Sequence, residues 1–407
     1  MIILISTALT IFFIELIVGG PGFWTLFGFS IRKLVFTICF FGLLLLTLGK
    51  QISLKKSDYI YLSFLALYLI AWMFIIPIFK DGNLSYSISD GLPLIYLGFA
   101  LFLFNFYQNN YEVWRIQRLI IFFLLQMIAL ITILIWTIGT MYPSLNVPIQ
   151  FVVNNYFSLG TASKVPSIYV GTMPDGFYRV LWITHIAFLP MLFITLLYKK
   201  YLSTLLFAFA IFATYTRAFW LVLFVFLIFL FMRDILFRKK VLGKRVIFSA
   251  TILFVFLIPV LGEFFLILSD RIEALFYDTS ASIRVIQLDA LLEGWKSAPL
   301  FGNGFGASVE YSRNSLSPFS YELTYVALLM KLGIVGFIIL NGLFFYHINF
   351  FSRFSDKQIC IVLGILSILS VSFTNPYLIN FVGLGFISLL LVEYNYIEES
   401  EELAFEN

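Results

Sequence analysis

Three arginines at the borders of apolar runs are the residues best suited to bind a phosphate-bearing ligand. Arg179 stands in FYRVLWITHIAF, Arg217 in ATYTRAFWLVLF and Arg284 in TSASIRVIQLDALL. Guanidinium groups recognise phosphate oxygens through paired hydrogen bonds. If the three arginines lie at one membrane depth, they form a binding site for a lipid-linked pyrophosphate, whose headgroup lies at that depth.

Each arginine also has a plainer interpretation. Arg217 could be an interfacial side chain that reaches to the membrane surface. Arg284 could be a solvated surface residue. However, it follows Ser280 and Ser282, either of which could cap a helix. A helix N-terminus favours an anion and disfavours a cation, so an arginine near it makes sense if it faces a negatively charged ligand.

Glu322, in SYELTYVALLM, is the best candidate for a general base. It begins a predicted helix, where a carboxylate also stabilises the helix dipole, so a purely structural role is an alternative. A partly buried carboxylate with a raised pKa could take a proton from an attacking sugar hydroxyl. Tyr321 and Tyr325 flank it and could stack on a sugar ring.

A glycine cluster precedes this helix in PLFGNGFG, residues 299–306. Alternate glycines let the backbone approach either a ligand or a neighbouring helix closely. We take Gly304, at the centre of the cluster, as a candidate substrate-binding position. The cluster lacks the sequel and the strand–helix context of nucleotide-binding glycine loops.

Other polar residues within apolar runs give weaker signals. His185 and His347 stand outside any cluster of metal ligands and are interpreted as packing or hydrogen-bonding residues. Cys39 and Cys360 lie in apolar runs and predict no disulfide. Glu15 is either an intramembrane functional carboxylate or an interfacial one. We expect no metal and no cofactor.

Composition sets the class of protein. Of 407 residues, 61% are hydrophobic and 12% charged, and the mean hydropathy is +0.99. Soluble domains are about 25% charged, so the chain is predicted to be a polytopic membrane protein. A net charge of +4 suggests no nucleic-acid partner.

About twelve apolar runs are long enough to cross or nearly cross a bilayer of ~30 Å, which predicts an all-α membrane domain over residues 1–407. The runs lie at 2–18, 34–49, 57–79, 91–107, 119–141, 180–198, 202–215, 218–232, 246–268, 322–350, 358–374 and 377–392.

The basic residues of the short loops predict the orientation. If the N-terminus is cytoplasmic, 15 of the 26 lysines and arginines fall in cytoplasmic loops, and the acidic C-terminal tail also ends there. These loops are 50–56, 108–118, 199–201, 233–245 and 351–357. Arg32 and Lys33 fall on the other side and do not fit this pattern.

Two long outer segments, residues 142–179 and 269–321, are expected to form helical loops that cap the outer face. The second carries four basic and six acidic residues and has helical spacing. A tight outer turn carries Arg217. Irregular backbone near the membrane is tolerated where protein covers it, so these segments are expected to pack together.

The order of these features resembles the Wzy-type O-antigen polymerase and O-antigen ligase superfamily. The resemblance rests on TYTRAFW at a short turn, a basic inner loop, SIRVIQLDALLEGWKSAPLFGNGFG and SYELTYVALLMKLGIVGFI. These motifs cover about 130 residues, and the topology extends the match over most of the chain.

The basic loops predict that both termini are cytoplasmic. The resemblance implies a GT-C-like glycosyltransferase of the bacterial inner membrane. It implies an inverting, metal-independent transfer between undecaprenyl-pyrophosphate-linked sugars at the periplasmic face. It also implies that outer-loop arginines bind the pyrophosphate, which matches Arg179, Arg217 and Arg284. From the chemistry of the side chains, we take Arg284 and Glu322 as the candidate catalytic residues. Membrane lipid and a chain-length regulator protein are the other implied partners.

One departure bears on the reaction. Ligases of the superfamily usually carry a histidine where this chain reads Ser320-Tyr321-Glu322, and residues 269–321 contain none. This favours a polymerase that transfers the growing chain to the hydroxyl of a new lipid-linked repeat unit. It leaves open whether Glu322 takes the place of the histidine. An O-antigen ligase acting on lipid A–core and a non-catalytic polysaccharide flippase are the alternatives.

Overall fold

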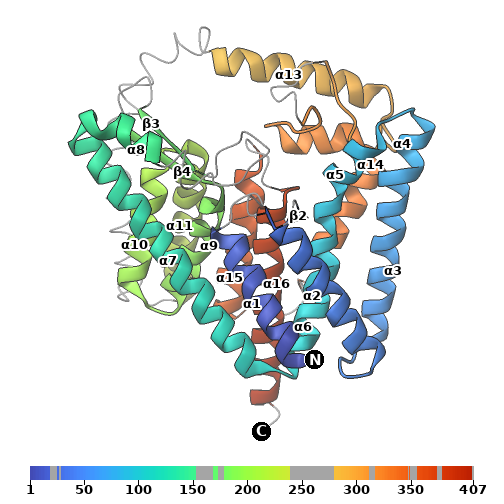
Figure 1. Ribbon diagram of the computed structural model, residues 1–407, viewed down its shortest axis with the longest axis horizontal. Coiled ribbons are helices and arrows are strands. Elements are labelled where there is room, and N and C mark those ends of the chain that lie inside the picture. Colours follow the sequence, from blue (N-terminus) through green and yellow to red (C-terminus); the bar gives the residue numbers. More distant parts are fainter. Residues whose placement is uncertain are drawn as a thin grey trace.

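The chain folds into an upright bundle of helices, and both termini lie at the same end of it (Figure 1). The computed structural model describes residues 1–18, 25–26, 29–152, 168–172, 178–238, 279–310, 317–346, 348, 355–373 and 378–405.

The N-terminal half contributes long helical segments, shorter helices and a two-stranded hairpin. Its elements are α1 (Ile2–Val18), β1 (Thr25–Leu26), β2 (Phe29–Ser30), α2 (Ile31–Leu48), α3 (Lys56–Ile70), a π-helical turn (Ala71–Ile75), α4 (Ile76–Phe79), α5 (Leu84–Gly91), a 3₁₀ turn (Leu92–Leu94), α6 (Ile95–Gln108), α7 (Tyr111–Met141), a 3₁₀ turn (Pro143–Leu145) and α8 (Asn146–Val152).

The C-terminal half adds a hairpin, six bundle helices and a helix that lies across the top of the bundle (Figure 1). Its elements are β3 (Ile168–Thr172), β4 (Tyr178–Trp182), a 3₁₀ turn (Ile183–Ala187), α9 (Phe188–Leu197), α10 (Tyr201–Ala213), α11 (Arg217–Arg238), α13 (Thr279–Lys296), α14 (Thr324–Phe345), α15 (Asp356–Val371) and α16 (Phe381–Phe405).

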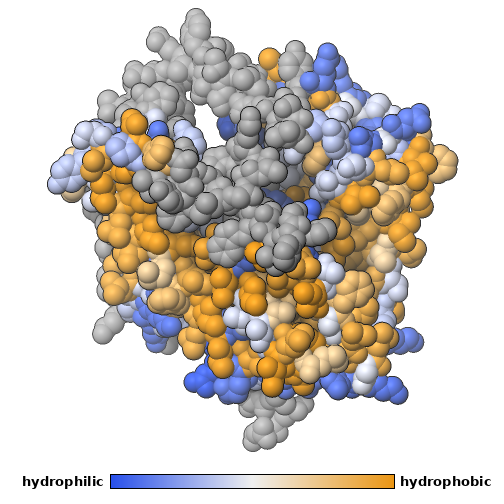
Figure 2. Space-filling model, in the orientation of Figure 1, coloured by the Kyte–Doolittle hydropathy of each residue, from blue (hydrophilic) through white to orange (hydrophobic). Residues whose placement is uncertain are grey.

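Apolar helices make this a membrane protein. In the described part, five helical segments are long and apolar enough to cross a bilayer, and six shorter apolar helices accompany them. The expected ninth span, 246–268, lies outside the described residues, so the number twelve stays a prediction. Figure 2 shows a broad apolar band across the visible face, with hydrophilic side chains gathered at both ends.

Large apolar side chains on several helices are exposed, which is unfavourable in water. Phe64 is 50% exposed, Phe79 83% and Leu202 84%. Contiguous apolar surface of this kind marks contact with membrane or protein. A lipid surrounding accounts for it.

Helices alternate in direction along the chain, so short connections gather at two ends (Figure 1). The connections at 49–55, 109–110 and 198–200 lie at the end that carries both termini. These connections coincide with basic loops that the sequence assigns to one side. Helix α13 and the hairpin β3–β4 lie at the opposite end, here called the cap end.

The core runs along α16, which packs against α6 and α15, while α15 also packs against α9. Leu384, Ile387 and Leu391 of α16 are fully buried. This packing fixes the middle of the bundle beneath the cap end.

The described residues are mostly helical, as expected, and two short hairpins accompany the helices. β1 pairs with β2, and β3 pairs with β4 in an antiparallel register that places Gly171 opposite Arg179. Residues 180–182 therefore belong to a strand and not to the start of the sixth span. The alternating buried and half-buried side chains of β4 explain this, because alternation is the period of a strand.

A backbone kink interrupts α14 at Gly333, where φ is 63° and ψ is −177°. A Cβ at this position would lie 2.3 Å from the carbonyl oxygen of Leu300. Only glycine adopts this conformation readily. The kink therefore depends on glycine and on close contact with the segment that follows α13.

Gly333→Ala is expected to lower the free energy of unfolding by about 2 kcal/mol or more, because the conformation and the contact both exclude a side chain. Gly342→Ala is the matched control in the same helix, since a Cβ there meets nothing within 4 Å. It should be neutral or stabilise by up to about 1 kcal/mol. Thermal unfolding of the purified variants measures both effects. Equal melting temperatures for Gly333→Ala and Gly342→Ala would contradict the requirement for glycine at the kink.

Candidate functional site

An ion pair at the cap end joins the two residues predicted to be catalytic. The Nε of Arg284 donates to Oε2 of Glu322 at 2.8 Å. The side chains are 41% and 26% exposed, so ligands can reach the pair. Helix α13 supplies the arginine, and the segment before α14 supplies the carboxylate. The structure thus brings together two residues that stand 38 positions apart in the chain.

A small apolar cluster packs α13 against α14 and so keeps Arg284 close to Glu322. The cluster consists of Leu291, Tyr321, Ala327 and Met330. It is separate from the main core of the bundle. The position of Arg284 over Glu322 therefore depends on this packing.

The start of α13 differs from the expectation. The helix begins at Thr279, so Ser280 and Ser282 lie inside it and do not cap it. Arg284 stands in its second turn, beyond the reach of most of the dipole effect. Its positive charge is offset by the carboxylate of Glu322.

The start of α14 also differs from the expectation. The helix begins at Thr324, and Glu322 lies two residues before it. Leu323 is the N-cap of α14 and has non-helical backbone angles, φ −80° and ψ 65°. Glu322 therefore lies just outside the first turn of α14, and its carboxylate forms an ion pair with Arg284.

The two flanking tyrosines brace the site. Tyr321 is buried and its hydroxyl oxygen accepts a hydrogen bond from the backbone of Val309 at 2.7 Å. Burial raises the pKa of Tyr321, so its phenol stays protonated near neutral pH. Tyr325 donates to the carbonyl of Leu369 at 2.9 Å, and its ring centroid lies 4.2 Å from that of Phe373. Stacking on a sugar stays a prediction for both.

The glycine cluster packs against other parts of the bundle. Gly304 is buried with φ +86°, and a Cβ there would lie 2.6 Å from the Pro77 ring. Its N–H donates to the carbonyl of Lys331 at 2.8 Å. Gly302 and Gly306 also have positive φ and close backbone neighbours. The close approach to a neighbouring helix is confirmed; the contact of Gly304 with substrate stays a prediction.

A buried ion pair lies directly beneath this segment. Nζ of Lys331 lies 2.6 Å from Oδ2 of Asp90, and the side chains are 6% and 8% exposed. The same carboxylate accepts from the N–H of Gly306 at 2.9 Å. Lys331 also donates to the carbonyl of Phe319 at 2.7 Å. The pair thus ties both ends of the loop that leads to Glu322.

Sequence reasoning missed this pair, although a signal was present. Lys331 interrupts an apolar run, and Asp90 immediately precedes another. Charged residues at membrane depth are usually paired. That rule identifies the two candidates, but only the fold shows that they face each other.

Arg179 lies at the outer turn before α11. Its Nε donates to the carbonyl of Thr214 at 3.0 Å, and one terminal nitrogen lies 3.4 Å from the hydroxyl of Thr216. Its guanidinium carbon is 5.8 Å from the centre of the Tyr169 ring. The hairpin β3–β4 therefore positions Arg179 directly against the TYTRAFW turn.

Arg217 begins α11 at this same turn, next to Thr216. Tyr215 has φ 48°, which lets the chain reverse between α10 and α11. The structure thus places Arg179 beside the backbone that leads into Arg217. The side chain of Arg217 lies outside the described residues.

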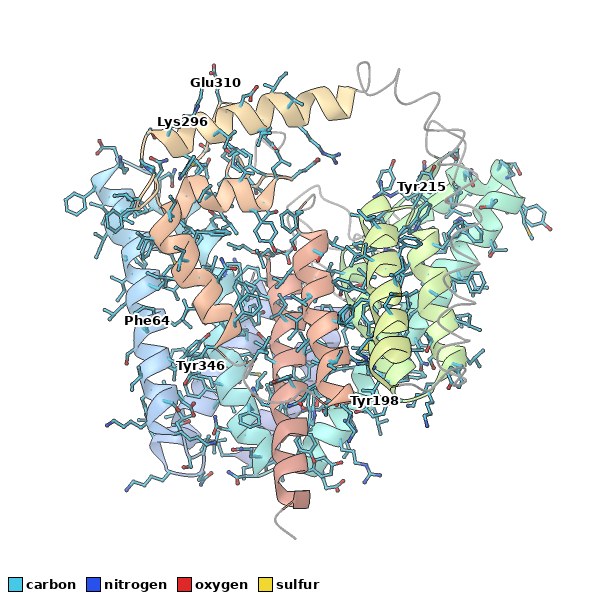
Figure 3. The ribbon with its side chains drawn as sticks, turned by 180° about the vertical axis from the view of Figure 1, so that it is seen from behind. Phe64, Tyr198, Tyr215, Lys296, Glu310 and Tyr346 are labelled. Atoms are coloured by element: carbon cyan, nitrogen blue, oxygen red, sulfur yellow. The ribbon has the colours of Figure 1, made fainter. Side chains whose placement is uncertain are left out.

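Both groups of residues belong to the cap end. Figure 3 labels Lys296 of α13, Glu310 and Tyr215 at this end, and Tyr198 toward the other. Arg284 of α13 and Arg179 of β4 therefore both lie at the cap end, away from the termini. That they share a single cavity with Glu322 stays a prediction.

Glu15 has a partner that the sequence did not suggest. Its carboxylate pairs with Arg32, and both side chains are almost fully buried. Arg32 also donates to the Glu15 carbonyl at 3.2 Å. This pair explains why Arg32 departs from the charge pattern of the loops, since it neutralises a buried carboxylate.

His185 is a packing residue, as predicted. It is fully buried, its Nδ1 accepts from the N–H of Trp182 at 2.9 Å, and its Nε2 lies 3.2 Å from the hydroxyl of Thr132. His347 lies outside the described residues. Within the described residues, no three His, Cys, Asp or Glu side chains form a metal-binding group.

The fold and this site define a helical membrane protein with a polar, arginine-bearing site at one end. Residues 202–340 match the family described as O-antigen ligase. The matched region contains Arg217, Arg284 and Glu322, and it supports membership of the O-antigen ligase and polymerase superfamily without separating the two activities. No curated protein and no solved structure matches the chain.

Proposed function

We propose that the protein polymerises lipid-linked oligosaccharide repeat units of an O-antigen or similar surface polysaccharide. The growing chain moves from undecaprenyl pyrophosphate to the non-reducing-end hydroxyl of a new lipid-linked repeat unit. The reaction takes place at the periplasmic face of a bacterial inner membrane, with both termini cytoplasmic. A chain-length regulator protein is a further partner in this proposal.

The proposed reaction is an inverting displacement at the anomeric carbon, without metal. The acceptor oxygen forms the new bond to this carbon, and the bond from the carbon to the pyrophosphate oxygen breaks. Its electron pair leaves with the pyrophosphate, and the acceptor proton passes to Glu322. Arg179, Arg217 and Arg284 stabilise the charge that develops on the leaving group.

The observation that carries this proposal is the Arg284–Glu322 pair, at 2.8 Å and partly exposed. A pyrophosphate offers Arg284 stronger, doubly charged partners than one carboxylate. When Arg284 turns to the phosphate oxygens, the carboxylate of Glu322 is released from this ion pair and can contact the acceptor hydroxyl. Positioning of the two substrates supplies the rest of the rate.

The ligase is the second candidate, because the matching family is described as O-antigen ligase. In that reaction lipid A–core replaces the repeat unit as acceptor. The lack of histidine in residues 269–321 supports the polymerase. A flippase is supported less, because the arginine-bearing groups gather at one end of the bundle.

An acceptor assay separates the two reactions. The purified full chain is supplied with a lipid-linked donor and either a lipid-linked repeat unit or lipid A–core. We expect a ladder of longer glycans on the lipid carrier. Transfer to lipid A–core alone would replace the polymerase with the ligase, and no transfer to either would support the flippase.

Arg217→Lys is expected to reduce polymer about tenfold, because lysine keeps the charge but loses the paired hydrogen bonds to phosphate. Arg115→Lys is the matched control: this arginine is 58% exposed beside Glu112 at the opposite end of the bundle. Gel analysis of surface polysaccharide measures both. Full polymer from Arg217→Lys would show that paired binding is unnecessary there.

A further inference from the structure

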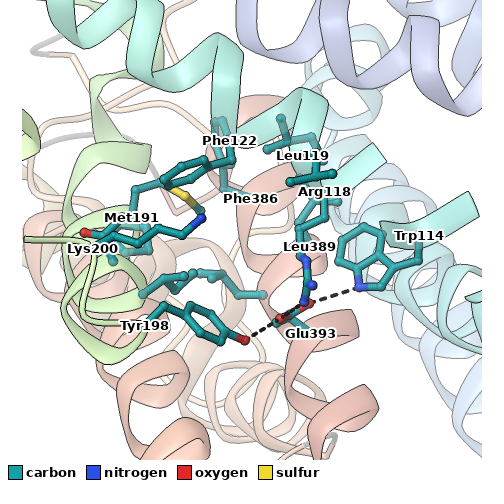
Figure 4. A pocket seen from close by; sticks show the side chains of 15 residues that line it. Trp114, Arg118, Leu119, Phe122, Met191, Tyr198, Lys200, Phe386, Leu389 and Glu393 are labelled. Atoms are coloured by element: carbon teal, nitrogen blue, oxygen red, sulfur yellow. Dashed lines mark hydrogen bonds and ion pairs between the residues drawn. The ribbon is translucent and has the colours of Figure 1, made fainter. Parts of the chain in front are cut away.

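A cavity lies between α7, α9 and α16, toward the end of the bundle that carries the termini (Figure 4). Its volume is about 160 Å³. The lining is mainly apolar and includes Leu119, Phe122, Met191, Ile194, Leu389 and Leu390. The cavity belongs to a part of the bundle remote from the Arg284–Glu322 pair.

Polar side chains gather at one end of this cavity around Glu393. Arg118 lies 2.8 Å from one carboxylate oxygen, Tyr198 donates to the same oxygen at 3.3 Å, and the Trp114 indole donates to the other at 3.0 Å. Figure 4 shows these contacts. The carboxylate of Glu393 is therefore neutralised by Arg118 and accepts hydrogen bonds at both oxygens.

Lys200 adds one positive charge that this network does not use. Its Nζ lies 4.6 Å from the centre of the Phe122 ring. Among the described residues it forms no ion pair, and the lysine is exposed. The rim of the cavity thus carries one net positive charge above an apolar lining.

Charge and depth together indicate the ligand. Tyr198, at this rim, lies toward the end of the bundle opposite to α13 (Figure 3). Leu119 is 56% exposed beside the cavity, which gives an apolar path from the cavity to the outside of the bundle. Lipid headgroups lie at the ends of a membrane-spanning bundle, and acyl chains lie along its apolar helices.

We propose that this cavity binds a phospholipid with one net negative charge, of the phosphatidylglycerol type. Its phosphate contacts Lys200, and part of an acyl chain enters between α7 and α9. An apolar cavity of about 150 Å³ accepts a benzene-sized molecule, so this one holds a segment of a chain and the remainder lies over Leu119. A zwitterionic lipid brings its own ammonium group close to Lys200 and binds more weakly.

The site is independent of the proposed glycan transfer. The network around Glu393 joins α7 to α16, and the lipid adds a contact between α7 and α9. Binding is therefore expected to stabilise the folded bundle, by an amount that grows with the logarithm of the lipid concentration once this exceeds the dissociation constant.

Native mass spectrometry of the full chain in detergent tests the site, with phosphatidylglycerol or phosphatidylcholine added. Lys200→Ala is expected to weaken phosphatidylglycerol binding about fivefold. Lys199→Ala is the matched control, because this neighbouring exposed lysine does not line the cavity. It should bind within about twofold of the unaltered chain.

A second variant tests the acyl segment without changing charge. Met191→Trp fills the cavity and should remove the bound phosphatidylglycerol, while circular dichroism shows an intact helical fold. Phosphatidylglycerol bound equally by Lys200→Ala and Lys199→Ala would overturn the proposal. So would equal binding of phosphatidylcholine, unchanged binding by Met191→Trp, or displacement of phosphatidylglycerol by equimolar undecaprenyl phosphate.

Discussion

Arg284→Ala is expected to abolish polymer while leaving the amount of protein in the membrane unchanged. The variant removes the cation nearest to Glu322 and, in the proposed reaction, a ligand of the departing pyrophosphate. Loss of one group that stabilises developing negative charge slows a reaction by about 10²–10³-fold. The arginine is 41% exposed, so its ion pair adds at most about 1 kcal/mol to stability. Immunoblots and polysaccharide gels measure protein and polymer separately.

Two further variants make this result specific. Lys296→Ala removes another exposed cation from the same helix, α13, and should leave polymer unchanged. Arg284→Lys keeps the charge but loses the planar donor group and should give an intermediate amount. Normal polymer in Arg284→Ala would remove this residue from the active site.

Lys331→Met is expected to lower the free energy of unfolding by about 3–5 kcal/mol, because it leaves the carboxylate of Asp90 buried without its cation. The pair is under 10% exposed on both sides and fixes Gly306 and Phe319. The loop that carries Glu322 should therefore loosen, and polymer should fall with stability. Chemical unfolding in detergent measures the loss.

A double variant and a surface pair provide the comparison. Asp90→Asn combined with Lys331→Met removes both charges and keeps an oxygen for the N–H of Gly306, so it should be more stable than the single variant. Arg115→Met breaks the exposed pair with Glu112, 3.7 Å apart, and should cost no more than about 1 kcal/mol. Equal losses in Lys331→Met and Arg115→Met would contradict a structural role for the buried pair.

Hydropathy predicted most of the helical bundle because length and apolar composition are local properties. The run at 57–79 becomes α3, a π-helical turn and α4, and the run at 119–141 becomes the outer part of α7. The kink at Gly333 lies where a lysine and two glycines interrupt the run at 322–350. The strand of Arg179 was mistaken for the start of a helix, since a run of apolar residues suits both elements.

Contacts between distant segments could not be predicted in the same way. Arg284 and Glu322 were each selected for their chemistry, but their 2.8 Å contact depends on how α13 folds back over α14. The pair of Asp90 and Lys331 joins segments 241 residues apart, and no local sequence pattern predicts that these two segments meet. The same holds for Arg32, whose charge made sense only beside Glu15.

Equilibrium binding of undecaprenyl pyrophosphate to the purified chain tests the central claim, a pyrophosphate site at the cap end, most directly. A charged hydrogen bond contributes about 1.5–3 kcal/mol, so Arg284→Ala should weaken binding roughly 10- to 100-fold. Arg179→Ala should weaken it similarly, and Lys296→Ala should not. Unchanged affinity in both arginine variants would contradict the account.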